Sequence, residues 1–206
     1  MTRKSIDLDS ITLYRGAHDA SSGRMCAMEL AAHMAGEEWT DSPACVSPVI
    51  AKFMIGLNDA FNDQQRQALK PLIPMCLGTA TGADDDQARG LLAVDWIVRE
   101  YTPTWLDLAG LTKEAADLRS LQEVTTWDLL AASTPTLMAV QKRAYATWAA
   151  AWAAARTAAR AAAWDAAWDA AGAAAGAAAG ARLGPTVAAL QLSAIALAER
   201  MAKVGK

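Results

Sequence analysis

Apolar residues recur at helical spacing along most of the chain after residue 25, and helix start and stop signals divide them into segments. The segment Met25 to Ala35 is followed by Gly36, a residue type that often ends helices. Ser47-Pro48 then supplies an N-cap and a first-turn proline ahead of VIAKFMIGLNDAF. The pattern therefore predicts a helix in each of these segments.

Similar signals predict further helices toward the middle of the chain. Asn62-Asp63 caps QQRQALKPLIP, whose two prolines end or kink the helix. Three aspartates at 84–86 precede QARGLLAVDWIVREY, and negative charge stabilises a helix N-terminus. Thr102-Pro103 opens a short helix that Gly110 stops, and Thr112 begins a helix over KEAADLRSLQEVTTWDLLAA. The apolar residues of QARGLLAVDWIVREY predict a broadly buried helix; they are Leu91, Leu92, Val94, Trp96, Ile97 and Val98.

Alanine fills most positions between 144 and 181, and this composition predicts a long helix. Ser133-Thr134-Pro135 is expected to start that helix, and Gly184-Pro185 to end it before a final helix, TVAALQLSAIALAERMAKV. The segment SIDLDSITLYRGAHDASSG alternates only briefly, so an extended arm or a short strand is expected there. The predicted fold is all-α, with an N-terminal arm over 1–22, a compact multi-helix domain over 23–133, the long Ala/Trp-rich helix over 134–183 and a C-terminal helix over 185–206 that packs back.

The alanine-rich segment contains a tetrapeptide repeat, WAAAWAAARTAARAAAWDAAWDAAGAAAGAAAG, which begins at Trp148. Four residues turn an α-helix by about 400°, so the variable position drifts about 40° per repeat. The first two tryptophans and the last two are therefore expected on opposite sides of the helix, with two arginines on the flank between them. The repeat positions concerned are Trp148, Trp152, Arg156, Arg160, Trp164 and Trp168.

Glycines end the repeat at 172, 176 and 180. Gly172, Gly176 and Gly180 would let a neighbouring backbone approach closely. A helix of this length must protrude, bend or break, and each glycine costs about 1 kcal/mol relative to alanine, which makes this end the favoured site for a break.

Two opposed tryptophan pairs need two apolar surfaces to cover them. One pair can dock on the protein's own helices, and the other then requires another part of the chain, a second copy or a foreign protein. An antiparallel dimer through either tryptophan face would set Arg156 and Arg160 against their own copies, so complementary charge is expected from elsewhere. Intramolecular packing of an expanded repeat is the simpler alternative. A nucleobase-stacking site is another, but the acidic first part of the chain and the aspartates at 165 and 169 count against it.

Composition and charge alter this interpretation little. The 206 residues are 53% hydrophobic and carry a formal net charge of −3, which suits a soluble protein with a sizeable core. Basic residues exceed acidic ones only after residue 142, an asymmetry too mild to predict nucleic-acid binding. Charged residues interrupt the alanine-rich run before it reaches the roughly 20 apolar residues of a membrane span. Cys26, Cys45 and Cys76 lack paired spacing and no signal peptide is recognisable, which predicts a reducing cytoplasm.

A metal site is one candidate for catalytic chemistry. Glu29, His33 and Glu37 recur at a spacing of four, and a histidine with two carboxylates on one helix face can hold a divalent metal. Gly36 is expected to end that helix before Glu37, which misplaces the third ligand. Surface carboxylates with a capping or packing histidine are therefore the simpler interpretation.

A thiol nucleophile is the other candidate. His18 or His33 lies near Cys26 and Cys45 in the sequence, but buried, unreactive cysteines are the simpler interpretation. The sequence contains no GxGxxG, Walker, HExxH or GxSxG motif. No cofactor is expected.

Several segments of the chain resemble a recurrent uncharacterised protein of actinobacteria and their phages: CAMELAAHMAGEEWTDSPACVSPVI, LNDAFND, LKPLIP and YTPTWLDLAGL. The resemblance covers Tyr14 to Leu121, and members of that family often carry an alanine-rich repeat tail of varying length. It implies a phage-borne or mobile-element origin in a bacterial host cell, where small proteins often act by occluding a host factor. That family has no established activity, so the resemblance implies no functional residue.

These features predict a non-catalytic helical interaction or assembly protein of the bacterial cytoplasm, whose partner is a host or phage protein, a second copy, or both. The predicted contact residues are the four repeat tryptophans, flanked by Arg156 and Arg160. One alternative is a small-molecule or nucleotide binder that uses the same residues. The other is a metal-dependent enzyme with Glu29 and His33 at its site.

Overall fold

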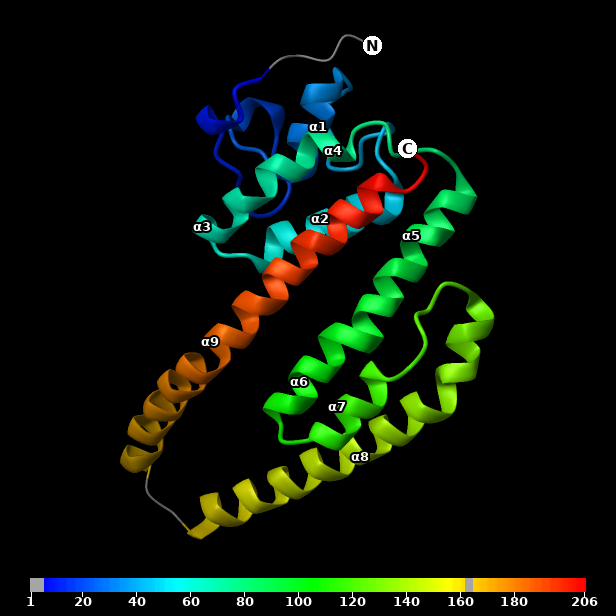
Figure 1. The fold of residues 1–206 in the computed structure, drawn as a ribbon. Coiled ribbons are helices and arrows are strands. Elements are labelled where there is room, and N and C mark those ends of the chain that lie inside the picture. The colour runs from blue at the N-terminus through cyan, green and yellow to red at the C-terminus, as the bar shows by residue number, and fades with distance from the viewer. Residues whose placement is uncertain (1–5, 162–164) are drawn as a thin grey trace. The chain divides into compact units, whose positions relative to one another are not determined.

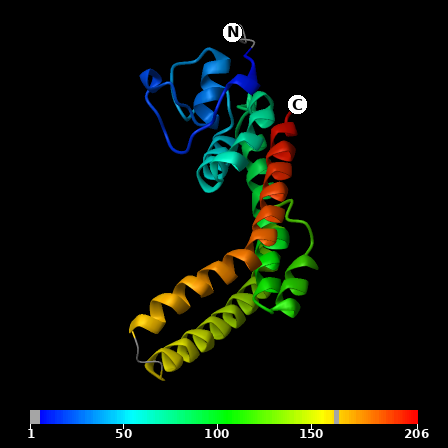
Figure 2. The ribbon, with the colours of Figure 1, turned by 90° about the vertical axis from the view of Figure 1, so that its left-hand side faces the viewer.

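The computed structural model describes residues 6–161 and 165–206, and within 151–152 and 154–182 it describes the backbone alone. The described residues form an all-α fold, which confirms the predicted class, and their one β-type contact is an isolated bridge between Leu13 and Met25. The two longest helices are α8 (Trp127–Ala161) and α9 (Asp165–Lys203) (Figure 1, Figure 2). The chain forms two compact units. The first unit is Met1–Ala93 with Leu192–Lys206, and the second unit is Val94–Gln191, so the division falls within α9 and within α5 (Ala83–Trp96).

Helix α1 (Ala27–Ala35) forms much of the core of the first unit. Every residue of α1 except His33 is buried, and the helix packs against α2 (Pro48–Ala60) and α4 (Ile73–Cys76). Gly36 ends α1 with a φ of 72°, a backbone conformation that glycine adopts at little cost. The predicted stop before Glu37 is therefore confirmed.

The segment between α2 and α4 follows its local signals. Asn62 caps α3 (Asp63–Arg66) in a reciprocal pair with Gln65, as the sequence predicts. A 3-10 helix at Gln67–Leu72 contains Pro71, and α4 begins next to Pro74. The prolines thus divide the predicted helix into short pieces rather than kinking one long one.

Amide side chains fasten the N-terminal arm to these helices. The arm contains 3-10 turns at Leu8–Ser10 and Ala20–Ser22. The Gln67 side chain accepts from the Leu13 amide and donates to the Leu13 carbonyl, both at 3.0 Å. Buried Asn58 accepts from the amide of Ala27 and donates to the carbonyl of Tyr14. The arm is therefore an extended segment held by side chains and not a strand of a sheet.

In the second unit, α5 continues through a π-helical turn at Ile97–Tyr101 into α6 (Thr102–Leu108). Pro103 has no N–H to offer the carbonyl four residues before it, and its ring crowds that carbonyl, so the helix widens at this point. Gly110 ends the segment with a φ of 77°, as predicted. Helix α7 (Thr112–Arg119) follows and packs against α6 and α8. The core between these helices is formed by Leu106, Ala115, Leu118 and Val140, with Leu111, Leu121, Leu137 and Ala144 packed around it.

Several helix bounds differ from the predicted ones. Helix α7 stops at Arg119, and α8 begins at Trp127 instead of Pro135, because the Thr126 hydroxyl accepts from the Leu129 amide and caps the new helix. Pro135 therefore lies inside α8. The helix expected over 134–183 corresponds to the later part of α8 and the first part of α9, and residues 162–164 between them lie outside the described residues.

The expected helix end at Gly184-Pro185 is also wrong, because α9 runs through both residues to Lys203. The backbone of Gly172, Gly176 and Gly180 is helical within α9, so the helix does not break at these glycines. The burial expected around residue 97 is incomplete, since Ile97 is exposed.

Candidate interaction surface

Helix α8 presents large apolar side chains to solvent on the side away from its core residues. Trp127, Met138 and Tyr145 are 53%, 64% and 63% exposed, and these three residues are called the α8 apolar face below. Their separations of eleven and seven residues are close to three and two helical turns, so they lie along one side of the helix. Val140 and Leu137, by contrast, pack into the core with α7. Together the three side chains expose roughly 400 Å², taking 150–250 Å² for a large side chain.

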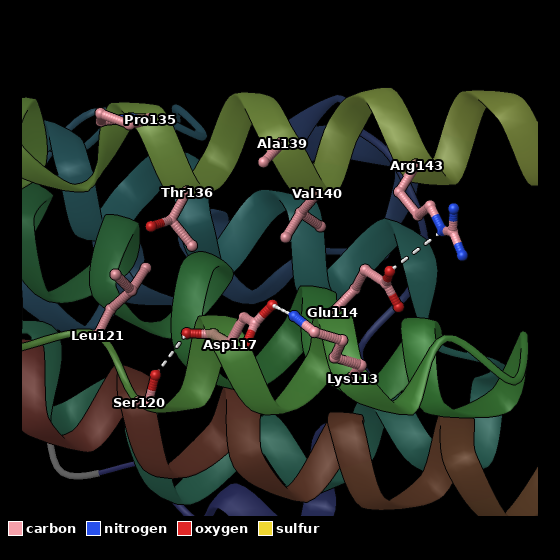
Figure 3. A pocket seen from close by; sticks show the side chains of 10 residues that line it. All are labelled: Lys113, Glu114, Asp117, Ser120, Leu121, Pro135, Thr136, Ala139, Val140 and Arg143. Carbon is pink, nitrogen blue, oxygen red and sulfur yellow. Dashed lines mark hydrogen bonds and ion pairs between the residues drawn. The ribbon is translucent and has the colours of Figure 1, made fainter.

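A groove runs between α7 and α8 on another side of the same helix. It encloses about 680 Å³, and Figure 3 shows five residues of the α7 region facing five residues of α8 across it. The lining residues are Lys113, Glu114, Asp117, Ser120 and Leu121 with Pro135, Thr136, Ala139, Val140 and Arg143. Val140 and Leu121 give the groove an apolar floor that continues into the core.

The ionisable side chains of this groove are paired with each other. Lys113 Nζ lies 2.7 Å from the Asp117 carboxylate, and Arg143 Nε lies 3.4 Å from the Glu114 carboxylate (Figure 3). The hydrogen bond to Asp117 raises the pKa of the Lys113 ammonium, so this amine stays protonated at neutral pH. A protonated, ion-paired lysine is a poor base or nucleophile.

Of the predicted contact residues, Trp148 lies on α8 next to the apolar face. It is 62% exposed, and a shallow hollow of about 460 Å³ is lined by Ala144, Tyr145 and Trp148. The repeat pattern does not predict Met138, Tyr145 or Trp127 as contact residues, because these residues lie before the tetrapeptide repeat. The other repeat positions lie outside the residues whose side chains are described: Trp152, Arg156, Arg160, Trp164 and Trp168.

The carboxylate of Glu29, a weak candidate metal ligand, is occupied by other contacts. Buried Glu29 accepts from the amides of His18 and Cys26, at 2.6 and 2.7 Å, and its carboxylate lies 3.1 Å from His18 Nδ1. It therefore fastens the N-terminal arm to the start of α1, and its partner is His18 in place of His33. Among the described residues, no group of three or more potential metal ligands is found.

The surroundings of the three thiols disfavour their ionised form. Burial raises the pKa of Cys26 and of Cys76 to about 12. Burial, together with the neighbouring Glu37 carboxylate, also raises the pKa of Cys45. Because the thiolate is the nucleophilic form, these shifts work against catalysis by any of the three. The second unit contains neither cysteine nor histidine.

Comparison with protein-family models, curated proteins and solved structures finds no match to this chain. Over the described residues, no helix combines the length and the apolar character that crossing a membrane requires.

Proposed function

We propose that this protein is a non-catalytic helical interaction protein and that the α8 apolar face is its docking surface. The exposure of Trp127, Met138 and Tyr145 along one side of one helix is the observation that carries the proposal. The three side chains are aligned along α8 with smaller or polar residues between them, and large apolar side chains that gather on one exposed side of a helix indicate an interaction surface. Aromatic residues and methionine are also the side chains that protein interfaces favour.

The energetics support a protein partner for this face. Burying roughly 400 Å² of apolar surface contributes about 10 kcal/mol before the costs of association are subtracted. A flat, elongated helix face offers few enclosing walls to a small molecule, whereas a second helix or a protein surface can cover its whole length. The partner is therefore a protein with an apolar helical surface. The resemblance of Tyr14 to Leu121 to actinobacterial and phage proteins favours a partner within a bacterial host cell.

Site-specific photo-crosslinking tests this proposal. A photoreactive phenylalanine analogue replaces Met138 or Tyr145 in the full chain, produced in an actinobacterial cell. The matched control carries the same analogue at Ala150, which is exposed on the same helix but away from the apolar face. Irradiation is expected to give intermolecular adducts from positions 138 and 145 but not from 150, whether the captured protein is a second copy or a foreign one.

A Met138→Glu substitution gives the complementary test. Placing a charge in the centre of the face is expected to abolish the adduct formed from position 145 while leaving the helix content unchanged by circular dichroism. Equal adduct yields from positions 145 and 150, or no intermolecular adduct from positions 138 and 145, would reject the α8 apolar face as a docking surface.

A further inference from the structure

The exposed side of α8 has the residue spacing of a coiled-coil seam. Starting at Trp127, exposed residues follow one another at alternating steps of four and three; they are Trp127, Ala131, Thr134, Met138, Gln141 and Tyr145. A 3.5-residue repeat of this kind keeps one line of side chains directed at a partner helix. An aromatic residue stands at each end of this set, and the four smaller side chains lie between the two. It is called the α8 seam below.

The α8 seam is self-complementary when two copies run in opposite directions. With a twofold axis near Thr136, Trp127 of one copy lies opposite Tyr145 of the other, and Thr134 lies opposite Met138. Ala131 lies opposite Gln141, so the small residue leaves room for the long one. In an antiparallel coiled coil, the a positions of one helix lie opposite the d positions of the other. In a parallel coiled coil, each seam residue would lie opposite its own copy.

Charge favours the antiparallel direction. Asp128 and Lys142 each follow a seam position and lie on the same flank of α8. In the antiparallel pair, the aspartate of one copy lies within one helical turn of the lysine of the other, and the twofold axis makes two such contacts. In a parallel pair, Asp128 and Lys142 would face the positions of Leu137 and Ala144 of the other copy. Those two residues are apolar and pack against the core of the second unit, so they offer no opposite charge.

We infer that the chain self-associates through the α8 seam as an antiparallel twofold dimer. This inference rests on the proposed function and names its partner as a second copy. The three large side chains of two copies bury roughly 800 Å² in this arrangement, and the smaller seam residues and their flanks extend it toward the ~1,200 Å² at which specific interfaces begin. The arginines at 156 and 160 lie beyond this seam, so their like charges do not oppose this pairing.

Light scattering after size exclusion, across a micromolar concentration series of the full chain, tests the dimer. The expected mass is twice 21.7 kDa for the wild type and for Ala150→Glu, the control that adds the same charge off the seam. Met138→Glu is expected to weaken association at least about 100-fold, because it places two carboxylates at the centre of the seam.

Charge reversal tests the direction. Asp128→Lys and Lys142→Glu are each expected to weaken association about fivefold to tenfold, and the double variant is expected to recover most of the wild-type affinity. Single reversals without effect, or a double variant as weak as the singles, would overturn the antiparallel pairing. A wild type that remains a monomer throughout, or an Ala150→Glu variant as weak as Met138→Glu, would overturn the seam. A monomer that still gives foreign adducts from positions 138 and 145 would retain the proposed function and lose only this inference.

Discussion

Single buried polar side chains hold distant segments of the first unit together. Arg89, which is fully buried, donates to the carbonyls of Met201 and Val204 at the end of α9 and also to the side chains of Thr81 and Asp86. A buried polar group left without a partner costs about 1–3 kcal/mol, so this arginine fixes the end of α9 against the start of α5.

Replacing Gly205 is expected to disturb this junction. Gly205 has a φ of 74°, and a Cβ there would lie 2.1 Å from a carboxylate oxygen of Asp85. Gly205→Ala is therefore expected to lower the free energy of unfolding by about 1–2 kcal/mol, measured by urea denaturation. Gly56→Ala is the control, because Gly56 is exposed inside α2 with open space around it, and alanine there is expected to add up to about 1 kcal/mol. Equal stability of the two variants would contradict the packing described for Gly205.

The carboxylate of Glu37 predicts a pH dependence of stability. Burial alone would raise the pKa of Glu37, but hydrogen bonds from the Cys45 side chain and from the amides of Ala44 and Cys45 lower it below its ordinary value. A depressed carboxyl pKa contributes stability that is present above the unfolded-state pKa, about 4.3, and is lost as pH falls through the folded-state pKa. Glu37→Gln is expected to destabilise the protein by about 1 kcal/mol at pH 7 and by progressively less below pH 4, measured by urea denaturation. A constant difference between the two proteins from pH 7 to pH 3 would refute this role.

At the scale of elements, helix ends marked by one strong local signal were predictable, and the start of α8, where Thr126 and Pro135 both offer a start signal, was not. Gly36, Asn62 and Gly110 act through their own backbone or side chain, so the sequence alone places those boundaries. The start of α8 was missed because Pro135 is an ordinary first-turn residue and yet is accommodated inside the helix. Thr126, three residues before Leu129, is the local cap signal that could have indicated the true start.

The α8 apolar face was not predicted from the sequence. Trp148, one of the predicted contact residues, is exposed on the same helix, and its role in a contact stays a prediction. The exposure of Met138 and Tyr145 depends on which elements cover α8, and a sequence pattern shows that a residue lies on one side of a helix without showing what lies opposite it. The four-residue repeat lies in the later part of the segment, whereas the 3.5-residue spacing of exposed residues precedes it and is less regular in residue type.

The connection between α7 and α8 depends on one buried aspartate. Asp95 accepts from the Val124 amide at 2.8 Å and forms a two-point ion pair with Arg99, at 2.7 and 3.0 Å. Asp95→Asn is expected to lower the free energy of unfolding by about 2–3 kcal/mol, because it weakens a buried charge-assisted contact. Asp117→Asn removes an exposed partner of Lys113 and is expected to change stability by less than about 1 kcal/mol. Similar losses in both variants, measured by urea denaturation, would show that Asp95 does not fasten the connection.

At the scale of the whole molecule, the first unit is assembled from segments at both ends of the sequence. Leu197, Ala198 and Met201 of α9 are buried among residues of the first ninety-three. Contacts of such long sequence separation form only after a large loop has closed, which slows folding more than it affects stability.

Truncating side chains on α9 measures how much this helix contributes to the stability of the first unit. Met201 is fully buried and Leu192 is 70% exposed, and both lie in the part of α9 that belongs to the first unit. Met201→Ala is expected to lower the free energy of unfolding by about 2–5 kcal/mol, while Leu192→Ala is expected to change it by no more than about 0.5 kcal/mol. Thermal and urea denaturation would both report the difference. Comparable effects of the two substitutions would argue against docking of this end of α9.

The placement of the native thiols has a practical consequence for spectroscopy. All three cysteines lie in the first unit, and each has a pKa raised above its ordinary value. A new cysteine introduced on the solvent side of α8 would be the fastest thiol to react with a maleimide near neutral pH. A fluorophore or spin label can therefore be attached to that helix with the native cysteines in place, so that the surroundings of the helix are reported on an otherwise unaltered chain.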